Sequence, residues 1–508
     1  MPATYRNPIL PGFHADPSVV RAGQDYYLVT SSFEYFPGVP VYRSRDLVHW
    51  KQVGNALTRE SQLKLAGQKS SKGIFAPTLR WNDGTFYMVT TNIENGGSFF
   101  VTTKDPAGEW SEPIFVGEKG FSMDPSLFFD DDGKVYYTRH GGGRNGGIYQ
   151  SQIDLATGAL REEPKLIWPG TGGIWPEGPH LYKVKGTYYV MISEGGTSYQ
   201  HSLTVARSRS PWGPFEANPA NPILTHRDKP ELPLQAVGHG DLVQTADGAW
   251  WVVLLGIRPT NRHHHLGRET LLAPVSWDAK RWPHVNRDEP LALEMSAAGL
   301  PRWSPFPAEA LRTEFDGSML GPQWVHLRTA STDRWSLAQR AGFLRLNGNG
   351  ETVDEIGSPA FVARRQEHFR MRAATRVEFV PAGEKQVAGL VLRQDEANHY
   401  ELRIAGSPGR RVELATRVAG VTTVQGTQPI EAGPVILRVD AYRDRYEFSC
   451  AVGGGPWVPV GSAPTEPLSS ERTGGFTGVF IGMYASGAAG ATMPPADFAW
   501  FDYEALDP

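Results

Sequence analysis

Residues 16–27, with the sequence DPSVVRAGQDYY, hold the pattern that decides the fold of this protein. An acidic residue and a proline open a short apolar run, a turn that contains glycine follows, and the aromatic pair Tyr26-Tyr27 begins a second run. The pattern repeats with a period of two residues instead of 3.6, which indicates strands. The stretch therefore predicts two antiparallel strands joined by a tight turn.

This unit occurs five times, at intervals of about 50 to 60 residues. The other copies open at Ala76-Pro77, Asp124-Pro125, Gly178-Pro179 and Gly240-Asp241, and their aromatic pairs are Phe86-Tyr87, Tyr136-Tyr137, Tyr188-Tyr189 and Trp250-Trp251. A second apolar hairpin follows the first, as at 41–50 and 99–110, so each unit holds four strands. Repeats of this kind are typical of propeller blades. A sandwich with chance similarity is the alternative, and five matching units disfavour it.

The pattern stops before residues 301–311, where prolines are frequent and no periodicity remains, as in a linker. Alternating apolar runs resume beyond it, for example at 386–392, 399–404 and 435–448. We therefore predict an all-β protein with a five-bladed β-propeller at residues 1–300, a linker at 301–311 and a β-sandwich at 312–508.

Composition excludes several classes of partner. The 50 basic and 54 acidic residues nearly balance and form no basic block, so nucleic acid is not expected to bind. The single Cys450 excludes an internal disulfide framework. No apolar signal segment precedes Asn7, and no stretch reaches the roughly 20 apolar residues of a membrane span. We expect a cytoplasmic protein without a membrane partner, although a removed signal would leave the same sequence, and a homo-oligomer stays open.

Three carboxylates are expected to meet at the propeller axis. The first strand of each blade lies nearest the axis, and its start opens at one mouth of the central channel. Asp16 and Asp124 hold the first position of their copies, and Glu177 lies one residue before it. Blades two and five carry Ala76 and Gly240 there, so propeller folding itself needs no acid. Neighbouring carboxylates repel and resist desolvation, so the cluster costs stability.

Such a cluster suits the hydrolysis of a glycosidic bond. One carboxylic acid protonates the leaving oxygen, and one carboxylate activates water. A third charge near the acid raises the acid's pKa. The alternative for each Asp-Pro-Ser alone is an Asx turn that opens a strand, but three carboxylates at equivalent places favour a functional site.

The chain resembles family 43 glycoside hydrolases, most closely their β-xylosidase branch. The resemblance is carried by residues 7–18, 30–38, 123–126, 175–179 and 238–242, which read NPILPGFHADPS, TSSFEYFPG, MDPS, WPEGP and GHGDL. It implies a five-bladed propeller, a C-terminal sandwich of the concanavalin type and inversion at the anomeric carbon. It also implies that Asp16 is the general base, that Glu177 is the general acid and that Asp124 tunes the pKa of the acid and orients it.

The same resemblance implies four substrate-binding residues. Phe33 matches an apolar wall against the sugar ring, and Phe75 stands where relatives often carry Trp. Arg268 matches an arginine that contacts the sugar and the base. His239 matches an axial histidine that touches a water network or a bound cation such as calcium. Catalysis requires no cofactor in this mechanism, and no protein-bound metal is expected among the catalytic residues.

The expected activity is exo-acting release of xylose from the non-reducing ends of xylo-oligosaccharides or arabinoxylan fragments. An α-L-arabinofuranosidase, or an enzyme with both activities, is the alternative within the class, and a non-catalytic glycan-binding propeller is the alternative outside it. The resemblance further implies that the sandwich packs on the propeller and helps close the pocket. The run His263-His264-His265 is not expected to bind a metal ion, because consecutive side chains point in alternating directions.

Overall fold

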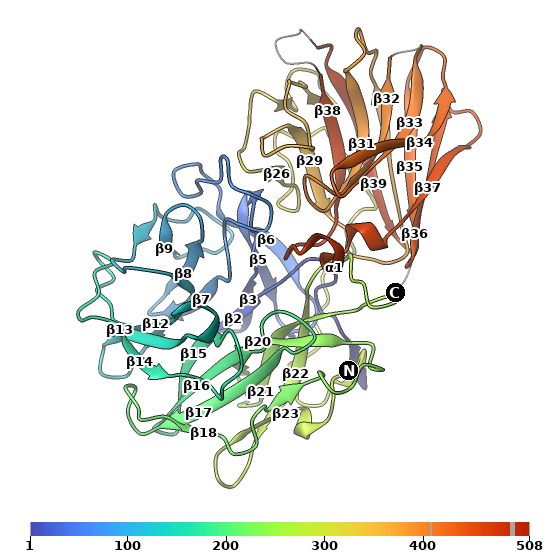
Figure 1. Cartoon of the computed structure of the whole chain (residues 1–508). Coiled ribbons are helices and arrows are strands. Elements are labelled where there is room, and N and C mark those ends of the chain that lie inside the picture. The colour runs from blue at the N-terminus through green and yellow to red at the C-terminus, as the bar shows by residue number, and fades with distance from the viewer. Residues whose placement is uncertain (1, 407–408, 488–492, 507–508) are drawn as a thin grey trace.

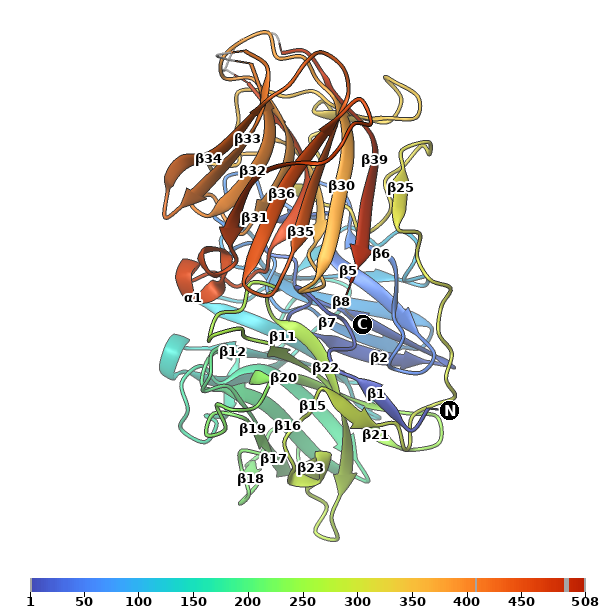
Figure 2. The same ribbon diagram turned by 90° about the vertical axis from the view of Figure 1, so that its right-hand side faces the viewer.

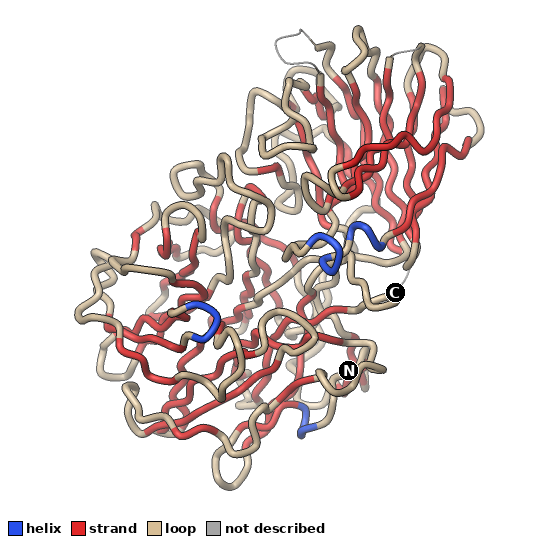
Figure 3. The backbone as a smooth tube through the Cα atoms, viewed as in Figure 1, coloured by secondary structure: helices blue, strands red, loops and turns tan. Residues whose placement is uncertain are grey.

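The computed structural model describes residues 2–406, 409–487 and 493–506 and consists almost entirely of strands (Figure 3). A propeller and a sandwich lie side by side, with α1 (Ser470–Thr473) between them (Figure 1). Turning the molecule by 90° shows both sheets of the sandwich standing on one side of the propeller (Figure 2). None of the helices in the described ranges has the length and apolar character needed to cross a membrane.

The five repeats fold into five antiparallel sheets, which confirms the predicted blades. Blade 1 holds β2 (Ser18–Ala22), β3 (Asp25–Val29), β5 (Gly38–Ser44) and β6 (Lys51–Leu57), and blade 2 holds β7 (Thr78–Asn82), β8 (Thr85–Asn92), β9 (Gly97–Thr103) and β10 (Ile114–Phe115). Blade 3 holds β11 (Ser122–Phe129), β12 (Val135–Gly141), β13 (Gly147–Gln152) and β14 (Lys165–Trp168). Blade 4 holds β15 (Glu177–Val184), β16 (Thr187–Glu194), β17 (Ser202–Ser208) and β18 (Glu216–Ala217), with β19 (Leu224–Thr225) on β17. Blade 5 holds β20 (Gln235–Gln244), β21 (Trp250–Ile257), β22 (Glu269–Trp277) and β23 (Pro283–Val285).

The repeated aromatic pairs lie in the second strand of every blade and pack between blades. Tyr27 of blade 1 meets Phe86 of blade 2 edge to face, with ring centroids 5.0 Å apart. Tyr87 of blade 2 meets Phe129 of blade 3 at the same distance. Buried aromatic side chains remove large apolar areas from water, so this recurring contact explains why the sequence repeats it.

The second domain is a sandwich of two antiparallel sheets around one apolar core. One sheet has the order β27 (Trp335–Ser336), β28 (Leu344–Leu346), β39 (Ala496–Ala505), β30 (Met371–Glu378), β35 (Val435–Ala441), β36 (Arg445–Val452) and β37 (Val458–Pro464), with β25 (Arg312–Glu314) on β39. The other has the order β29 (Ala360–Arg365), β38 (Phe480–Ser486), β31 (Val387–Arg393), β32 (His399–Ala405), β33 (Arg411–Val418) and β34 (Val421–Pro429). Cys450 is buried in this core, as an inert apolar residue would be.

Backbone pairing and aromatic stacking join the two domains. Strand β26 (His326–Leu327) of the second domain pairs with β4 (Tyr35–Phe36) of the propeller. Tyr35 stacks on Phe480 with ring centroids 3.7 Å apart. Residues 301–311 form no strand or helix, and the backbone N–H of Ser304 donates to Asp46 of blade 1 at 2.7 Å. The connecting segment is therefore held against the propeller.

Candidate active site

The innermost strands of blades 3, 4 and 5 are interrupted where they reach one mouth of the channel. The pairing register shifts between Met123 and Ser126, between Glu177 and His180, and on both sides of Gly238. A bulge of this kind turns a side chain out of the ladder and re-aims it. The repeated interruption therefore points side chains of different blades toward one space.

Left-handed backbone conformations accompany these interruptions. The φ angle is 55° at Asp16, 54° at Asp124 and 49° at His239. A non-glycine residue in this region costs roughly 1–3 kcal/mol and persists only where the surrounding fold enforces it. The propeller thus stores strain at the positions that carry the predicted polar side chains.

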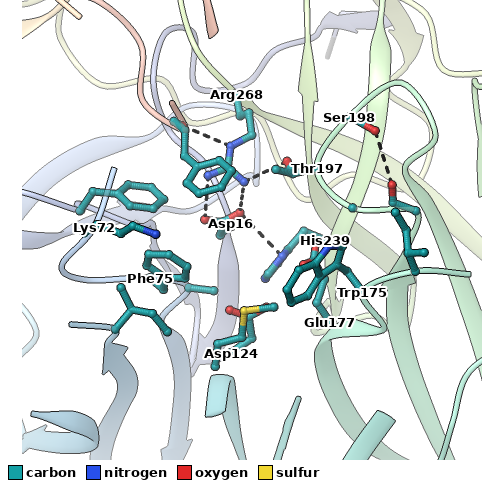
Figure 4. A pocket seen from close by; sticks show the side chains of 18 of the residues that line it. Asp16, Lys72, Phe75, Asp124, Trp175, Glu177, Thr197, Ser198, His239 and Arg268 are labelled. Carbon is teal, nitrogen blue, oxygen red and sulfur yellow. Dashed lines mark hydrogen bonds and ion pairs between the residues drawn. The ribbon is translucent and has the colours of Figure 1, made fainter. Parts of the chain in front are cut away.

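All seven predicted site residues line one cavity of about 510 Å³ at this mouth: Asp16, Phe33, Phe75, Asp124, Glu177, His239 and Arg268 (Figure 4). They come from blades 1, 3, 4 and 5 and from the segment before blade 2. The cavity has the size of a small-molecule site. The roles assigned to these residues stay predictions.

Asp16 lies in an environment that favours its charged form. Arg268 donates Nη1–H to Asp16 Oδ1 at 2.8 Å and Nη2–H to Oδ2 at 3.3 Å, and the Ser31 hydroxyl donates to Oδ2 at 2.5 Å. Burial opposes ionisation, but Arg268, His239 and Ser31 together hold the pKa of Asp16 below its ordinary value. Asp16 is therefore a carboxylate, as a general base must be.

Asp124 lies in the opposite kind of environment. It is 6% exposed and accepts the Gly178 N–H at 3.1 Å. Burial first, then the charges of Glu177 and Asp16, raise the pKa of Asp124 well above its ordinary value. Asp124 therefore keeps its proton more readily than an exposed aspartate does. His201, fully buried, places Nε2 3.4 Å from Glu177 Oε1.

An aromatic wall closes the Asp16 side of the cavity. Phe33 lies 5.2 Å from Phe75 and 5.9 Å from Phe476, measured between ring centroids. The guanidinium of Arg268 lies 5.7 Å from the Phe33 ring and 5.6 Å from the Phe476 ring. Phe476 belongs to the sandwich, so the second domain completes the cavity. No repeat or motif marks this residue in the sequence.

The Glu177 side carries different aromatic side chains, Trp175 and Phe121, which also line the cavity and which are not among the predicted site residues. Their ring centroids are 6.5 Å apart. His140 donates from Nδ1 to the Pro176 carbonyl oxygen at 2.7 Å and so holds the segment that carries Trp175 and Glu177. The WPEGP run was the available signal, because it places Trp175 two residues before Glu177.

Comparison with known proteins agrees with this geometry. The model of "Glycosyl hydrolases family 43" matches residues 5–283, and that of the "Beta xylosidase C-terminal Concanavalin A-like domain" matches residues 312–504. The chain belongs to glycoside hydrolase family 43. It is therefore an exo-acting glycosidase, and the resemblance seen in the sequence is confirmed.

Relatives whose names give different activities match this chain over nearly its whole length. A non-reducing end α-L-arabinofuranosidase of Bacteroides ovatus is 45% identical over 99% of this chain and 95% of its own length. A xylosidase/arabinosidase of Butyrivibrio fibrisolvens is 40% identical over 98% of this chain and 99% of its own. The crystal structure of a xylan β-1,4-xylosidase from Bacillus halodurans is 37% identical, with a TM-score of 0.93 over 98% of this chain and 100% of its own.

A buried ion-pair network ties the aromatic wall of the cavity to the sandwich. Glu34, next to Phe33, pairs with Arg393 of β31 at 3.4 Å, and both side chains are fully buried. Arg393 also donates to Tyr35 at 3.1 Å and to Glu396 at 2.8 Å. Burial raises the pKa of Glu34, while the Arg393 charge opposes that rise. The turn that presents Phe33 therefore depends on a guanidinium from the second domain.

The side chains around His239 do not by themselves supply the oxygen ligands of a calcium ion. Calcium takes six to eight oxygen ligands. The His239 ring packs over Gly178, its Nδ1 lies 3.7 Å from Asp16, and that carboxylate is already bound by Arg268 and Ser31. In the described ranges, groups of three or more His, Cys, Asp or Glu with ligand atoms close together comprise Asp354, His399 and Glu401 of the sandwich, far from this cavity in the chain and outside its lining. A bound calcium ion or a water network beside His239 stays a prediction.

The three consecutive histidines diverge, as expected. His263 faces Glu466 at 3.5 Å, His264 pairs with Glu471 at 2.7 Å, and His265 is buried beside Phe369. All three side chains therefore contact the sandwich.

Proposed function

We propose that this hydrolase releases single β-D-xylosyl units from the non-reducing ends of xylo-oligosaccharides, with inversion of configuration. The observation that carries the proposal is the contrast within one cavity between Asp16, whose pKa is held low by Arg268, His239 and Ser31, and Asp124, whose pKa is raised by burial and by the charges of Glu177 and Asp16. An inverting glycosidase needs one group of each kind.

In the proposed reaction, Asp16 takes a proton from a water molecule, whose oxygen attacks the anomeric carbon. Glu177 gives its proton to the glycosidic oxygen, and the bond to the leaving group breaks. Inverting enzymes hold the two carboxyl groups about 6.5–9.5 Å apart, so that the water fits between base and sugar. In this proposal Asp124, whose pKa is raised by burial and by the charges of Glu177 and Asp16, tunes the pKa of the acid and orients it. This acid–base mechanism uses no cofactor.

A blocked cavity supports exo action on a short chain. Phe33, Phe75 and Phe476 stand behind Asp16, and apolar rings suit the C–H face of a pyranose. Arg268 lies between this wall and the base and can donate to a sugar hydroxyl.

An α-L-arabinofuranosidase activity is the second candidate, favoured by the 45% identical relative from Bacteroides ovatus. Arabinofuranose and xylopyranose present similar hydroxyl patterns, and one cavity can accept both. Turnover of 4-nitrophenyl β-D-xyloside and of 4-nitrophenyl α-L-arabinofuranoside, measured side by side, decides between them. A higher kcat/KM for the arabinofuranoside would contradict the xylosidase proposal.

Stereochemistry and leaving-group dependence test the mechanism. NMR of the fresh product from a β-xyloside should show α-xylose first, and early β-xylose would contradict inversion. Glu177→Gln should slow substrates with poor leaving groups much more than activated aryl xylosides, because only the former need protonation. Equal losses would contradict Glu177 as the acid. The cytoplasmic location stays a prediction that fractionation can test, and gel filtration would establish the oligomeric state.

A further inference from the structure

Trp175 is held at the cavity without being buried. Its backbone N–H donates to the Arg144 carbonyl oxygen at 2.7 Å, and its φ angle is 52°, a left-handed conformation. The side chain is only half-buried, which is unusual for the largest apolar residue in a strained segment. Packing alone does not require this conformation, because a core tryptophan would be covered.

Its neighbours leave one face of the indole toward the cavity. The His140 ring lies 5.8 Å away on one side, and Gly196 lies against the indole, where an added Cβ would come to 3.4 Å from Cδ1. Within the described residues, no protein acceptor pairs with the indole N–H. Phe121, which is 47% exposed, extends the apolar surface toward solvent.

The aromatic surface of Trp175 and Phe121 lies on the same side of the cavity as Glu177 (Figure 4). Figure 4 shows Trp175 beside Glu177, on the side of the cavity away from Phe75. The atom that Glu177 protonates belongs to the leaving group, so the leaving group must lie on the Glu177 side. A pyranose ring presents C–H groups that stack on aromatic faces, and a free indole N–H can donate to a hydroxyl.

We propose that Trp175 and Phe121 form the platform for the leaving-group sugar, so that binding is tighter for substrates whose leaving group is itself a pyranose ring. The inference rests on the proposed function, because it takes Glu177 as the acid. It holds for either glycone, since the ring released from a xylo-oligosaccharide or from an arabinofuranosyl side chain of xylan is a xylopyranose. His140 is a positioning residue for the platform, acting through the Pro176 carbonyl oxygen.

The test compares a leaving group with a ring and one without. Trp175→Ala should lower kcat/KM for xylobiose about 10-fold or more, mainly through KM, because stacking on the indole is lost. The same variant should change kcat/KM for β-D-xylosyl fluoride by less than about twofold, because fluoride does not reach the platform. Phe121→Ala should act in the same direction with a smaller loss, and Trp175→Phe should restore part of the activity on xylobiose.

Trp81→Ala is the matched control. Trp81 is 41% exposed on blade 2 and lies outside the cavity lining, so both substrates should turn over as in the wild type. Equal losses of Trp175→Ala on xylobiose and on xylosyl fluoride, or no loss on xylobiose, would overturn the platform. A wild-type enzyme that hydrolyses neither compound would count against the proposed function instead.

A binding measurement without turnover separates failure of the platform proposal from failure of the proposed function. In an Asp16→Asn background, calorimetric titration with xylobiose should show about 10-fold weaker affinity when Trp175→Ala is added. Equal affinity of the single and double variants, or no binding of xylobiose to the Asp16→Asn protein, would overturn the platform whatever the enzyme hydrolyses.

Discussion

Asp124 and Asp241 are two carboxyl groups buried on inner strands of the same propeller, and their surroundings differ completely. Asp241 accepts hydrogen bonds from the Ser18 hydroxyl at 2.6 Å, the Tyr182 hydroxyl at 2.7 Å and Arg80 at 2.8 Å. Arg80 first, then His180 and the Ser18 hydroxyl, hold the pKa of Asp241 at about 2 in spite of its burial. The hydrogen bond that Asp124 accepts within the described residues comes from Gly178, and the pKa of Asp124 is raised well above its usual range.

The difference distinguishes a buried carboxylate that stabilises the fold from a buried carboxyl group that serves the predicted chemistry. Asp241 joins blades 1, 2, 4 and 5 deep in the channel, and every charge there has a partner. At the mouth, Arg268 pairs with Asp16, while burial and the charges of Glu177 and Asp16 raise the pKa of Asp124 well above its ordinary value. Under-compensated carboxyl groups cost stability, and proteins keep them where chemistry needs them.

Loss of the base should have the largest effect. We expect Asp16→Asn to lower kcat about 10³-fold or more, because the amide cannot take a proton from water. Xylose binding should stay measurable by calorimetry, and the melting temperature should show that the fold persists. Near-normal turnover would contradict the assignment of the base.

Asp124→Asn should lower kcat about 10²-fold and stabilise the fold. The pKa of Asp124 is higher in the folded than in the unfolded protein, so its contribution to stability is present at low pH and is lost as pH rises through the folded pKa. Asparagine removes that loss. The melting temperature of the variant should exceed that of the wild type by about 2 °C or more at pH 8, with a smaller gain at pH 5. A lower melting temperature at both pH values would contradict the comparison.

Phe476→Ala should lower kcat/KM for small aryl xylosides about 10-fold, because the second domain then no longer completes the sugar wall. The Phe476 backbone oxygen that accepts from Arg268 Nε at 3.4 Å remains in this variant. The melting temperature should change little, since the side chain is only half-buried. Unchanged kinetics would show that hydrolysis by Asp16, Asp124 and Glu177 does not need the Phe476 side chain of the sandwich.

Asp241→Asn should have the smallest effect on rate, within about threefold, and a clear effect on stability. Its folded pKa of about 2 lies below the unfolded value, so its contribution is present above the unfolded pKa and is lost as pH falls toward 2. We expect about 2–4 kcal/mol less stability at pH 7, since the variant also leaves Arg80 without its carboxylate. Denaturant unfolding should show the difference shrinking by about half at pH 3. A loss of activity as large as that of Asp124→Asn would contradict a purely structural role for Asp241.

Repeat alignment made the mouth residues predictable, because equivalent positions of a repeat occupy equivalent places in the blades. Asp16, Asp124 and Glu177 were found in this way. Phe476 could not be found, since it lies in a glycine-rich stretch of another domain with no repeat partner. Arg393 has no local signal either, because its partner Glu34 is brought to it only by domain packing.

The sequence by itself determined the period of the strands, the number of blades and the residue types that reach the axis, because these follow from local alternation and from the spacing of turns. Only the tertiary structure decided which carboxyl group keeps a proton and which is ionised. Protonation depends on burial and on the charges that neighbours bring, and for Asp16 the decisive neighbour is Arg268, from the last blade. The closure of the cavity by Phe476 is tertiary for the same reason, since it depends on how the sandwich packs against the propeller.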